Sequence, residues 1–438
     1  MGQVPTGAWQ VETLAQSARL LAERGESTQA EAVYREILAA APHHLPALNF
    51  LATQAIRRGD HAEAIAHLEQ ALRAAPDRAV SHQNLAMAHK AAGDHERALA
   101  GLGRAAELDP ALRTAHLHMG ALLEEMGRKD EAVAAYWRAW LQFPAPELLT
   151  NPSIAPPHLW TLCLHAAERV RTAQHELIEQ ALEPLYARHG RGALARVDAS
   201  ARIYLGLQSP VHPHPLQKPS FLYLPGVPPR PFFDHNELGW LDALEQVAGE
   251  IRSELQALLE DSDAALAPYV QLTEDAVTAV WQGLNHSKQW SSFHLLRGGV
   301  INTDNCSRCP ATARILSILP LPEVPGHAPE AFYSVLQPGT HIPPHHGVGN
   351  YKLVVHLPLV VPDGCALRVG DETRGWREGE CLVFDDSFEH EAWNRSGSTR
   401  AVLIIDAWNP LITEAEREGM TALLAAIASF RKRLIAPP

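Results

Sequence analysis

The stretch GDHAEAIAHLEQALRAAP, residues 59–76, sets the structural class of the first third of the chain because its pattern recurs. Its first residue belongs to a series of glycines with a constant interval of 34 residues: Gly25, Gly59, Gly93 and Gly127. Its last residue belongs to a series of prolines with the same interval: Pro42, Pro76, Pro110 and Pro144. A period of this length is the signature of stacked helical repeats, so the chain is expected to begin with an α-solenoid.

Each repeat has the apolar spacing of two amphipathic helices separated by the glycine. In one repeat, the apolar positions of the two helices are Leu48, Leu51, Ala52 and Ala55, then Ala64, Ile65, Leu68, Ala71 and Leu72. The proline ends the second helix because it lacks an amide hydrogen and clashes with the preceding turn.

In Gly59, Ala64, Ala71 and Pro76 this unit resembles the tetratricopeptide repeat family. The resemblance implies four repeats over residues 11–146 and a concave groove that binds a protein or peptide. The alternative is an array that only scaffolds or dimerises the rest of the chain. The histidines of this region have no ligand spacing, so they are interpreted as groove or surface residues and not as a metal site.

Length and composition limit what such a chain does. Its 438 residues exceed one hydrophobic core, so at least two domains are expected. A formal net charge of −13 disfavours nucleic acid and anionic membranes as partners, because both require a concentrated positive surface. Neither a secretory signal nor a membrane-spanning run is recognised, and the five cysteines form no disulfide framework. A cytoplasmic protein is expected. The sequence does not indicate its oligomeric state.

Between the repeats and the next domain the period is lost. Residues 147–208 remain helix-like and are expected to cap the solenoid, whose last apolar face needs cover. Residues 209–235 are dense in proline and are interpreted as a linker and domain boundary. A helix within residues 236–258 is expected to pack on the outside of a domain that extends to residue 412, and residues 413–438 are expected to form a C-terminal helix.

From about residue 290 the pattern changes to short β-like runs broken by glycine and proline. The runs are AFYSVL (331–336), KLVVHLPLVV (352–361), CALRVG (365–370), CLVF (381–384) and RAVLIIDAW (400–408). Several short strands of this kind predict an all-β sandwich or barrel. Two histidine-bearing motifs lie at strand ends within it, HIPPHHGVGN (341–350) and FDDSFEHEAWN (384–394).

His345 and His390 are too far apart in sequence to be neighbours on one element, so only the fold can bring them together. A double-stranded β-helix, or cupin-like jelly roll, would place both motifs at one mouth, where neutral imidazoles suit a first-row divalent metal. The common oxygenase arrangement has a carboxylate two residues after the first histidine, but that position is Gly347. On spacing alone, the metal site is incomplete.

The run FYSVLQPGTHIPPHHGVGN (332–350), with LVFDDSFEHEAWN (382–394) and VLIIDAWNP (402–410), resembles the aspartyl/asparaginyl β-hydroxylase family. The resemblance covers about residues 220–410, and members of this family also have glycine at the position of the missing carboxylate. It implies that His345 and His390 hold Fe(II), with water in place of the carboxylate, and that 2-oxoglutarate and dioxygen are cosubstrates. No catalytic residue is expected beyond these metal ligands.

The same resemblance implies that Arg400 clamps the distal carboxylate of 2-oxoglutarate with help from Ser334. His356 would contact the other carboxylate. A guanidinium suits the first role because its fork binds a carboxylate through two hydrogen bonds. Alternation along residues 352–361 agrees, since it puts Lys352 and His356 on one face and leaves the other face aliphatic, as a ligand cavity requires.

The polar residues beside the two histidines are expected to support the site. Asp385 and Asp386 are interpreted as groups that orient the second histidine or cap a turn, with direct metal ligation as the alternative. His341 and His346 are interpreted as structural neighbours. The single pair of cysteines in CSRC (306–309) is too little for a zinc site.

The residues expected to contact the substrate depart from the family pattern. Family members carry two arginines on the strand that bears His356, whereas this chain has Lys352 and Val354. Lys352 is predicted to bind substrate, and Asp406 lies on the Arg400 face, where it either pairs with a cation or is an ordinary strand-end carboxylate.

The sequence thus predicts an α+β multidomain protein, an α-solenoid followed by a double-stranded β-helix at residues 236–412. The predicted function is Fe(II)- and 2-oxoglutarate-dependent hydroxylation of the β-carbon of an aspartyl or asparaginyl residue in a protein or peptide presented by the repeats. The alternatives are the same chemistry on a free amino acid, lipid or small molecule, and a scaffold without catalysis.

Overall fold

The computed structural model of the chain describes residues 6–141, 159–261, 266–274 and 276–435. The chain divides into two units, Met1–Ala173 with Arg431–Pro438, and Gln174–Phe430. The division falls inside one helix, α9 (Trp160–His189), and not in residues 209–235, where the sequence predicts a boundary. Among the helices described, none is both long enough and apolar enough to cross a lipid bilayer.

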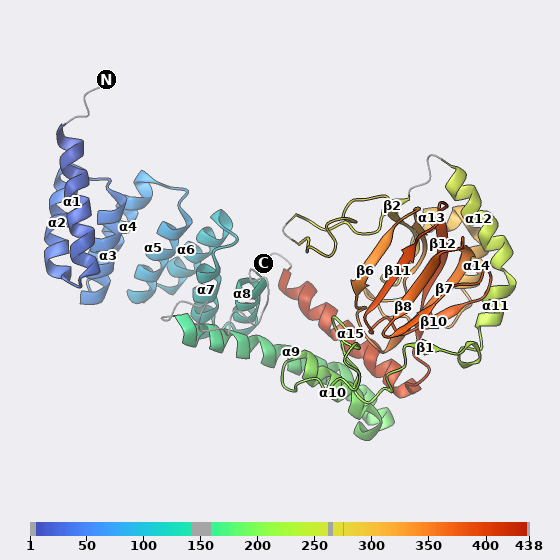
Figure 1. Ribbon diagram of the computed structural model, residues 1–438. Coiled ribbons are helices and arrows are strands. Elements are labelled where there is room, and N and C mark those ends of the chain that lie inside the picture. The colour runs from blue at the N-terminus through green and yellow to red at the C-terminus, as the bar shows by residue number, and fades with distance from the viewer. Residues whose placement is uncertain (1–5, 142–158, 262–265, 275, 436–438) are drawn as a thin grey trace. The chain divides into compact units, whose positions relative to one another are not determined.

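The first unit contains an array of paired helices, blue to teal in Figure 1. They are α1 (Thr6–Glu23), α2 (Ser27–Ala40), α3 (Leu45–Arg58), α4 (His61–Ala74), α5 (Ala79–Ala91), α6 (His95–Leu108), α7 (Arg113–Glu125) and α8 (Lys129–Leu141). The predicted α-solenoid is confirmed. Its first helix is described from Thr6, upstream of the predicted start at residue 11, while Pro144 and the end of the fourth repeat lie outside the described residues.

The periodic glycines form the turns within the helix pairs. Gly59, for example, follows α3 with a φ of 79°, and Gly25, Gly93 and Gly127 have φ values between 77° and 81°. Only glycine adopts this left-handed conformation without steric cost from a Cβ atom. The sequence period therefore corresponds to a backbone requirement repeated once per helix pair.

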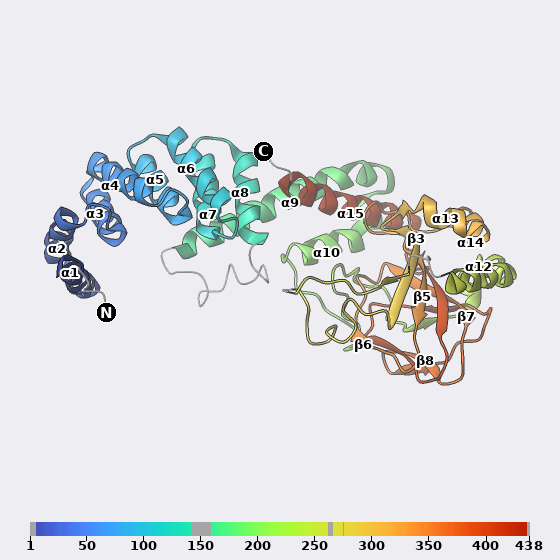
Figure 2. The same ribbon diagram turned by 90° about the horizontal axis from the view of Figure 1, so that it is seen from above.

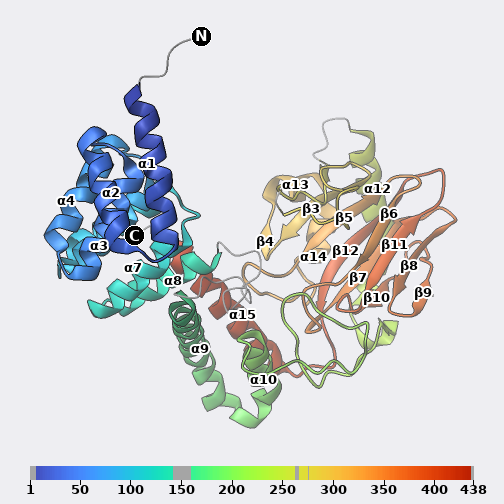
Figure 3. The ribbon, with the colours of Figure 1, turned by 60° about the vertical axis from the view of Figure 1, so that its left-hand side comes forward.

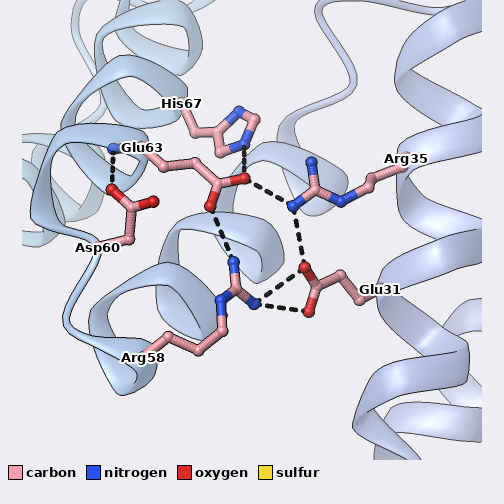
Figure 4. A network of polar contacts seen from close by, with 6 residues as sticks. All are labelled: Glu31, Arg35, Arg58, Asp60, Glu63 and His67. Atoms are coloured by element: carbon pink, nitrogen blue, oxygen red, sulfur yellow. Dashed lines mark hydrogen bonds and ion pairs between the residues drawn. The ribbon is translucent and has the colours of Figure 1, made fainter.

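Charged side chains join neighbouring repeats at the surface (Figure 4). Glu63 on α4 accepts hydrogen bonds from Arg35 of α2, at 2.6 Å, and from Arg58 of α3, at 2.8 Å. Glu31 of α2 accepts from the same two arginines, at 3.0 and 2.8 Å. Each guanidinium thus bridges two carboxylates, which ties three helices together.

The first half of α9 belongs to the repeat unit and contacts its last repeat. Arg169 donates to the carboxylate of Glu124 at 2.6 Å, and Tyr136 donates to the same carboxylate at 2.8 Å. A cap was predicted over residues 147–208. Residues 147–158 lie outside the described part of the chain, and only the start of α9 belongs to the first unit.

The second half of α9 packs in the second unit with α10 (Ala195–Tyr204) and α15 (Glu414–Ile435), side by side in Figure 3. Their buried apolar residues form one core with part of the proline-rich stretch. Members of this core from the four segments include Leu182, Val197, Leu222, Leu224, Met420 and Leu424.

Residues 209–235 differ from a free linker because their backbone is bound to the β-domain. Ser220 N donates to Gly347 O at 2.8 Å, Lys218 N donates to Ser387 O at 2.9 Å, and Phe232–Phe233 pairs as strand β1 with β10. Proline removes hydrogen-bond donors but leaves the intervening amides free to bind. We call residues 214–233 the strap.

Two antiparallel sheets form the β-domain. The larger has the order β1-β10-β7-β12-β5-β3-β2 with β4 paired to β3, and the smaller has the order β6-β11-β8-β9. The strands are β1 (Phe232–Phe233), β2 (Ala267–Pro268), β3 (Trp290–Arg297), β4 (Val300–Ile301), β5 (Ala331–Leu336), β6 (His341–His345), β7 (Lys352–Val360), β8 (Cys365–Val369), β9 (Glu372–Arg374), β10 (Leu382–Phe384), β11 (His390–Asn394) and β12 (Arg400–Trp408). The predicted jelly-roll class is confirmed.

Helices cover the outer face of the larger sheet. They are α11 (Leu241–Gln246), α12 (Ala248–Glu260), α13 (Thr303–Arg308) and α14 (Pro310–Leu316). Their apolar residues, such as Ile251 and Leu255, share a core with Leu353, Val355 and Leu357 of β7. Figure 2 shows α12 to α14 on one side of this sheet and β6 and β8 on the other, so the remaining face of β7 lies toward the smaller sheet.

Candidate metal and cosubstrate site

The inner faces of the two sheets enclose a cavity of about 580 Å³. Its lining includes every residue predicted for the site: His345, His390, Ser334, His356, Arg400 and Lys352. On β7 the alternation holds, because Lys352, Val354 and His356 line the cavity while Leu353, Val355 and Leu357 lie in the outer core. The larger sheet supplies the first wall and β6, β8 and β11 supply the second.

His345 and His390 face each other across the pair β6 and β11, where they are register partners with ring centroids 4.1 Å apart. Each ring is oriented by its own backbone: the Nδ1 of His345 lies 2.8 Å from Pro343 O, and that of His390 lies 2.9 Å from Phe388 O. A carbonyl only accepts, so Nδ1 carries the hydrogen and Nε2 keeps its lone pair.

Burial keeps both rings neutral. It lowers the pKa of His345 to about 3 and that of His390 to about 4, and the mutual proximity of the rings adds to the effect on His345. Two neutral imidazoles that keep their Nε2 lone pairs in one cavity are suited to hold a divalent first-row metal.

A carboxylate lies beside this pair although position 347 has none. The backbone N–H of Gly347 donates to Asp386 O at 2.6 Å, and the Asp386 side chain packs against Gly347. Asp386 is 9% exposed, and its Oδ1 is buried with no hydrogen-bond partner in the described part of the chain. A buried carboxylate oxygen with this environment is suited to accept a hydrogen bond from water or to face a cation.

Arg400 lies at one end of the cavity, where no described carboxylate pairs with it. Its side chain is 1% exposed, its Nη1 is 3.4 Å from Ser334 Oγ, and its Nε has no hydrogen-bond partner among the described residues. Burial lowers its pKa to about 10, so it stays charged at neutral pH. No carboxylate of the described chain forms an ion pair with it, which indicates an anionic ligand.

Neighbouring side chains fix the polar groups at this end. Trp290 Nε1 donates to Ser334 Oγ at 3.1 Å, and Trp376 Nε1 donates to His356 Nδ1 at 3.2 Å. His356 therefore carries its hydrogen on Nε2, and burial with the nearby Arg400 charge lowers its pKa well below the usual value. A neutral donor and a cation next to each other are suited to bind carboxylates.

The other end of the cavity holds a buried ion pair. Lys352 Nζ donates to Asp406 Oδ1 at 2.6 Å, and Asp406 Oδ2 accepts from Glu330 N at 2.9 Å. Burial disfavours the charge on Lys352, but Asp406 and Asp386 outweigh it and raise its pKa above the ordinary value. Of the two interpretations of Asp406, the structure has the carboxylate paired with a cation.

Comparison with known proteins agrees with this architecture. Residues 245–410 match the family described as aspartyl/asparaginyl beta-hydroxylase, and residues 21–85 and 55–111 match the tetratricopeptide repeat family. Aspartate beta-hydroxylase domain-containing protein 2 of Mus musculus is 31% identical over 267 residues, which cover 60% of this chain and 73% of that protein. The chain belongs to the aspartyl/asparaginyl β-hydroxylase family. Both resemblances inferred from the sequence are confirmed.

Other relatives match shorter parts of the chain. Aspartyl/asparaginyl beta-hydroxylase of Homo sapiens is 34% identical over 203 residues, or 45% of this chain and 25% of that protein. Ornithine lipid ester-linked acyl 2-hydroxylase of Rhizobium tropici is 35% identical over 189 residues, or 42% of this chain and 63% of that protein. The chain thus spans a quarter of the human protein and less than two thirds of the bacterial one.

Three cavity or support residues were not singled out from the sequence. Trp376 lies between β9 and β10 and orients His356, Glu330 precedes β5 and lines the cavity, and Gln217 of the strap donates to Asp385 Oδ2 at 3.0 Å. Asp385 itself is turned away from the cavity toward the strap. Gln217 precedes the residues that carry the family resemblance, so no signal in the sequence pointed to it.

A second cluster of possible ligands lies at the surface. His235, Asp242 and Glu245 bring donor atoms within 4.8 Å of one another. Glu245 already accepts from Cys381 N at 2.6 Å, and the other two side chains are exposed, so no site is assigned there.

Proposed function

We propose that the chain is an Fe(II)- and 2-oxoglutarate-dependent dioxygenase that hydroxylates the β-carbon of an aspartyl or asparaginyl residue in a protein or peptide. The observation that carries the proposal is Arg400, a buried guanidinium without a carboxylate partner in the described chain, in one cavity with two neutral histidines. A dicarboxylate that binds the guanidinium at one end and a metal at the other fits this arrangement.

The residues fit an iron centre. His345 and His390 would hold Fe(II) through Nε2, and the Asp386 carboxylate beside Gly347 would accept a hydrogen bond from a water on the metal. Arg400 and Ser334 would hold the distal carboxylate of 2-oxoglutarate, and His356 would donate to the other. When bound, iron and 2-oxoglutarate supply the oxidation: one oxygen atom enters the substrate C–H bond, the other enters succinate, and CO₂ leaves.

The repeat array supports a protein or peptide as the substrate or partner, because tetratricopeptide repeats present an extended concave surface. A cytoplasmic location is part of the proposal and is supported by the five cysteines, all of which are free. The same chemistry on a free amino acid, lipid or small molecule is a second candidate. It is favoured by the similarity to the Rhizobium tropici hydroxylase, whose name specifies an acyl group.

Succinate formation tests the proposal without a known substrate. Purified protein with Fe(II), dioxygen and 2-oxoglutarate should release succinate slowly, and His345→Ala and Arg400→Ala should abolish this. Matched controls are His341→Ala on the same strand and Arg377→Ala, an exposed arginine, both of which should leave the rate unchanged. Absence of succinate from the unaltered protein under all conditions would favour a scaffold without catalysis.

The substrate class is tested by mass spectrometry in the host. Proteins that gain one oxygen atom only when His390 is intact would support peptide hydroxylation. A gain confined to lipids or small metabolites would support the second candidate.

A further inference from the structure

The strand register separates the cavity into two ends. Arg400 and Asp406 are six residues apart on β12, about 20 Å along an extended strand. On the neighbouring strands Ser334 pairs near Arg400, through Val402, while Val354 pairs with Asp406. Arg400 and Ser334 therefore lie at one end of the cavity, and His356 lies between the ends, opposite Ile404. Lys352, Asp406 and Glu330 lie at the opposite end, which remains for the substrate side chain.

Lys352 does not present a free positive charge at this opposite end. Its ammonium group is 2.6 Å from Asp406 Oδ1, both side chains are buried, and Asp386 is near enough to contribute to the Lys352 pKa. Val354, the next residue of β7 on the cavity face, is apolar. One cation is thus held among carboxylates, with no second cation beside it on this strand.

A third carboxylate lines the same end. Glu330 accepts from Gly298 N at 2.6 Å, and its other oxygen is 3.3 Å from His294 Nδ1. The remaining cation of the cavity lining at this side is Arg297, which is exposed at the rim, where solvent screens its charge. A substrate carboxylate would therefore approach Lys352 against Asp406, Asp386 and Glu330, and like charges at close range are strongly unfavourable.

A carboxamide meets no such repulsion. Its carbonyl oxygen accepts from Lys352 Nζ, which has three donors and uses one on Asp406, and its NH₂ group donates to a neighbouring carboxylate. The Lys352–Asp406 pair thus presents a donor and an acceptor side by side, the complement of an amide. Given the proposed function, we infer that this site selects an asparaginyl side chain over an aspartyl side chain.

The test uses two pools of degenerate peptides that are identical except for a central asparagine or aspartate. The full-length protein is assayed with Fe(II) and 2-oxoglutarate for succinate release above the substrate-free rate and for a gain of one oxygen atom. The asparagine pool should be turned over at least about tenfold faster. Absence of substrate-free succinate release would instead defeat the proposed function, and is thus a separate outcome.

A second positive charge beside Lys352 tests whether electrostatic repulsion causes the preference for asparagine. Val354→Arg adds a second cation on the cavity face, so it should raise turnover of the aspartate pool and reduce the asparagine preference by at least about tenfold. Val354→Met adds length without charge and should keep the preference of the unaltered protein. Should Val354→Arg not fold, the ratio measured with the unaltered protein still decides. Equal turnover of the two pools, a preference for aspartate, or stimulation by neither pool while substrate-free succinate is released, would overturn the inference.

Discussion

The carboxylate of Asp386 fills the space into which a side chain at Gly347 would project. A Cβ atom built on Gly347 would lie 2.0 Å from Asp386 Oδ2 and 2.1 Å from its Cγ. The two positions belong to different histidine motifs and come together because β6 and β11 are paired. A carboxylate therefore lies near the first histidine although its own motif contains none.

Gly347→Ala should consequently destabilise the second unit. Asp386 is buried, and its carboxylate would have to move away from the extra methyl group, which is expected to cost about 1–3 kcal/mol through overpacking. If Asp386 supports a metal-bound water, metal affinity should also fall by about 10- to 100-fold. Denaturant unfolding and titration with Mn(II) measure the two effects.

Two further variants separate this crowding from a general effect of alanine. Gly397→Ala, where a Cβ atom meets nothing within 4 Å, should change stability by less than about 0.5 kcal/mol. Adding Asp386→Ala to Gly347→Ala should recover part of the lost stability, since it vacates the contested space. Additive losses in the double variant would show that the two positions do not compete.

Arg400→Met should separate stability from ligand binding. A buried charge without a partner costs free energy, so its removal should leave the melting temperature of the ligand-free protein unchanged or raise it. Loss of the two charge-assisted hydrogen bonds should weaken 2-oxoglutarate binding at least about a hundredfold. Thermal melts with and without 2-oxoglutarate report both, and Arg377→Met is the exposed control. A lower melting temperature with an intact shift by 2-oxoglutarate would mean that Arg400 is structural.

Gln217→Leu should weaken metal binding from outside the cavity. The Gln217 amide donates to Asp385 Oδ2 at 3.0 Å and to Ser387 Oγ at 3.2 Å, and thus fixes the loop before His390. Asp385 Oδ1 still accepts from Ser387 N at 2.9 Å, but Oδ2 loses its donor inside the protein, which should cost about 1–3 kcal/mol. Lys218→Ala is the matched control, because Lys218 is exposed and contacts this loop through its backbone. Unfolding and Mn(II) titration should then differ between the two variants; equal behaviour would contradict the role of the side chain.

The repeat unit should lose stability in acid partly through Glu63. Hydrogen bonds from Arg35, and then from Arg58, hold the pKa of Glu63 below its ordinary value. A carboxylate whose pKa is lower in the folded state stabilises the fold above its unfolded pKa of about 4.5, and this stability is lost as the pH falls. Glu63→Gln should therefore make the melting temperature of the repeat helices, measured by circular dichroism, depend less on pH between about pH 5 and 3. Glu69→Gln, exposed on the same helix, should leave it unchanged.

Periodic features were predictable because they are local. The glycine series reports a left-handed turn, and the alternation from Lys352 to Val360 reports which side chains face the cavity. The strand candidates 331–336 and 400–408 coincide with β5 and β12 because β-branched and aromatic residues are dense there.

Relationships between distant segments were not predictable in the same way. Asp386 beside Gly347, and Gln217 beneath Asp385, depend on strand pairing and strap contacts that leave no period in the sequence. The proline-rich stretch reads as a linker because proline breaks helices, but its binding to the β-domain uses backbone amides, which carry no residue signal. The position of the unit boundary within α9 was missed for the same reason.

The shared core of α9, α10, the strap and α15 determines at which residue this protein can be truncated and still fold. A fragment of residues 236–412, the span predicted from sequence patterns, would expose Tyr351 and Ile412 to solvent. It would also lack the strap, whose backbone binds both histidine-bearing loops. Such a fragment should aggregate, or bind Mn(II) more weakly than the whole chain. Fusion of the second unit to another repeat array therefore requires a junction near Gln174, upstream of all the segments that bind the two histidine-bearing loops.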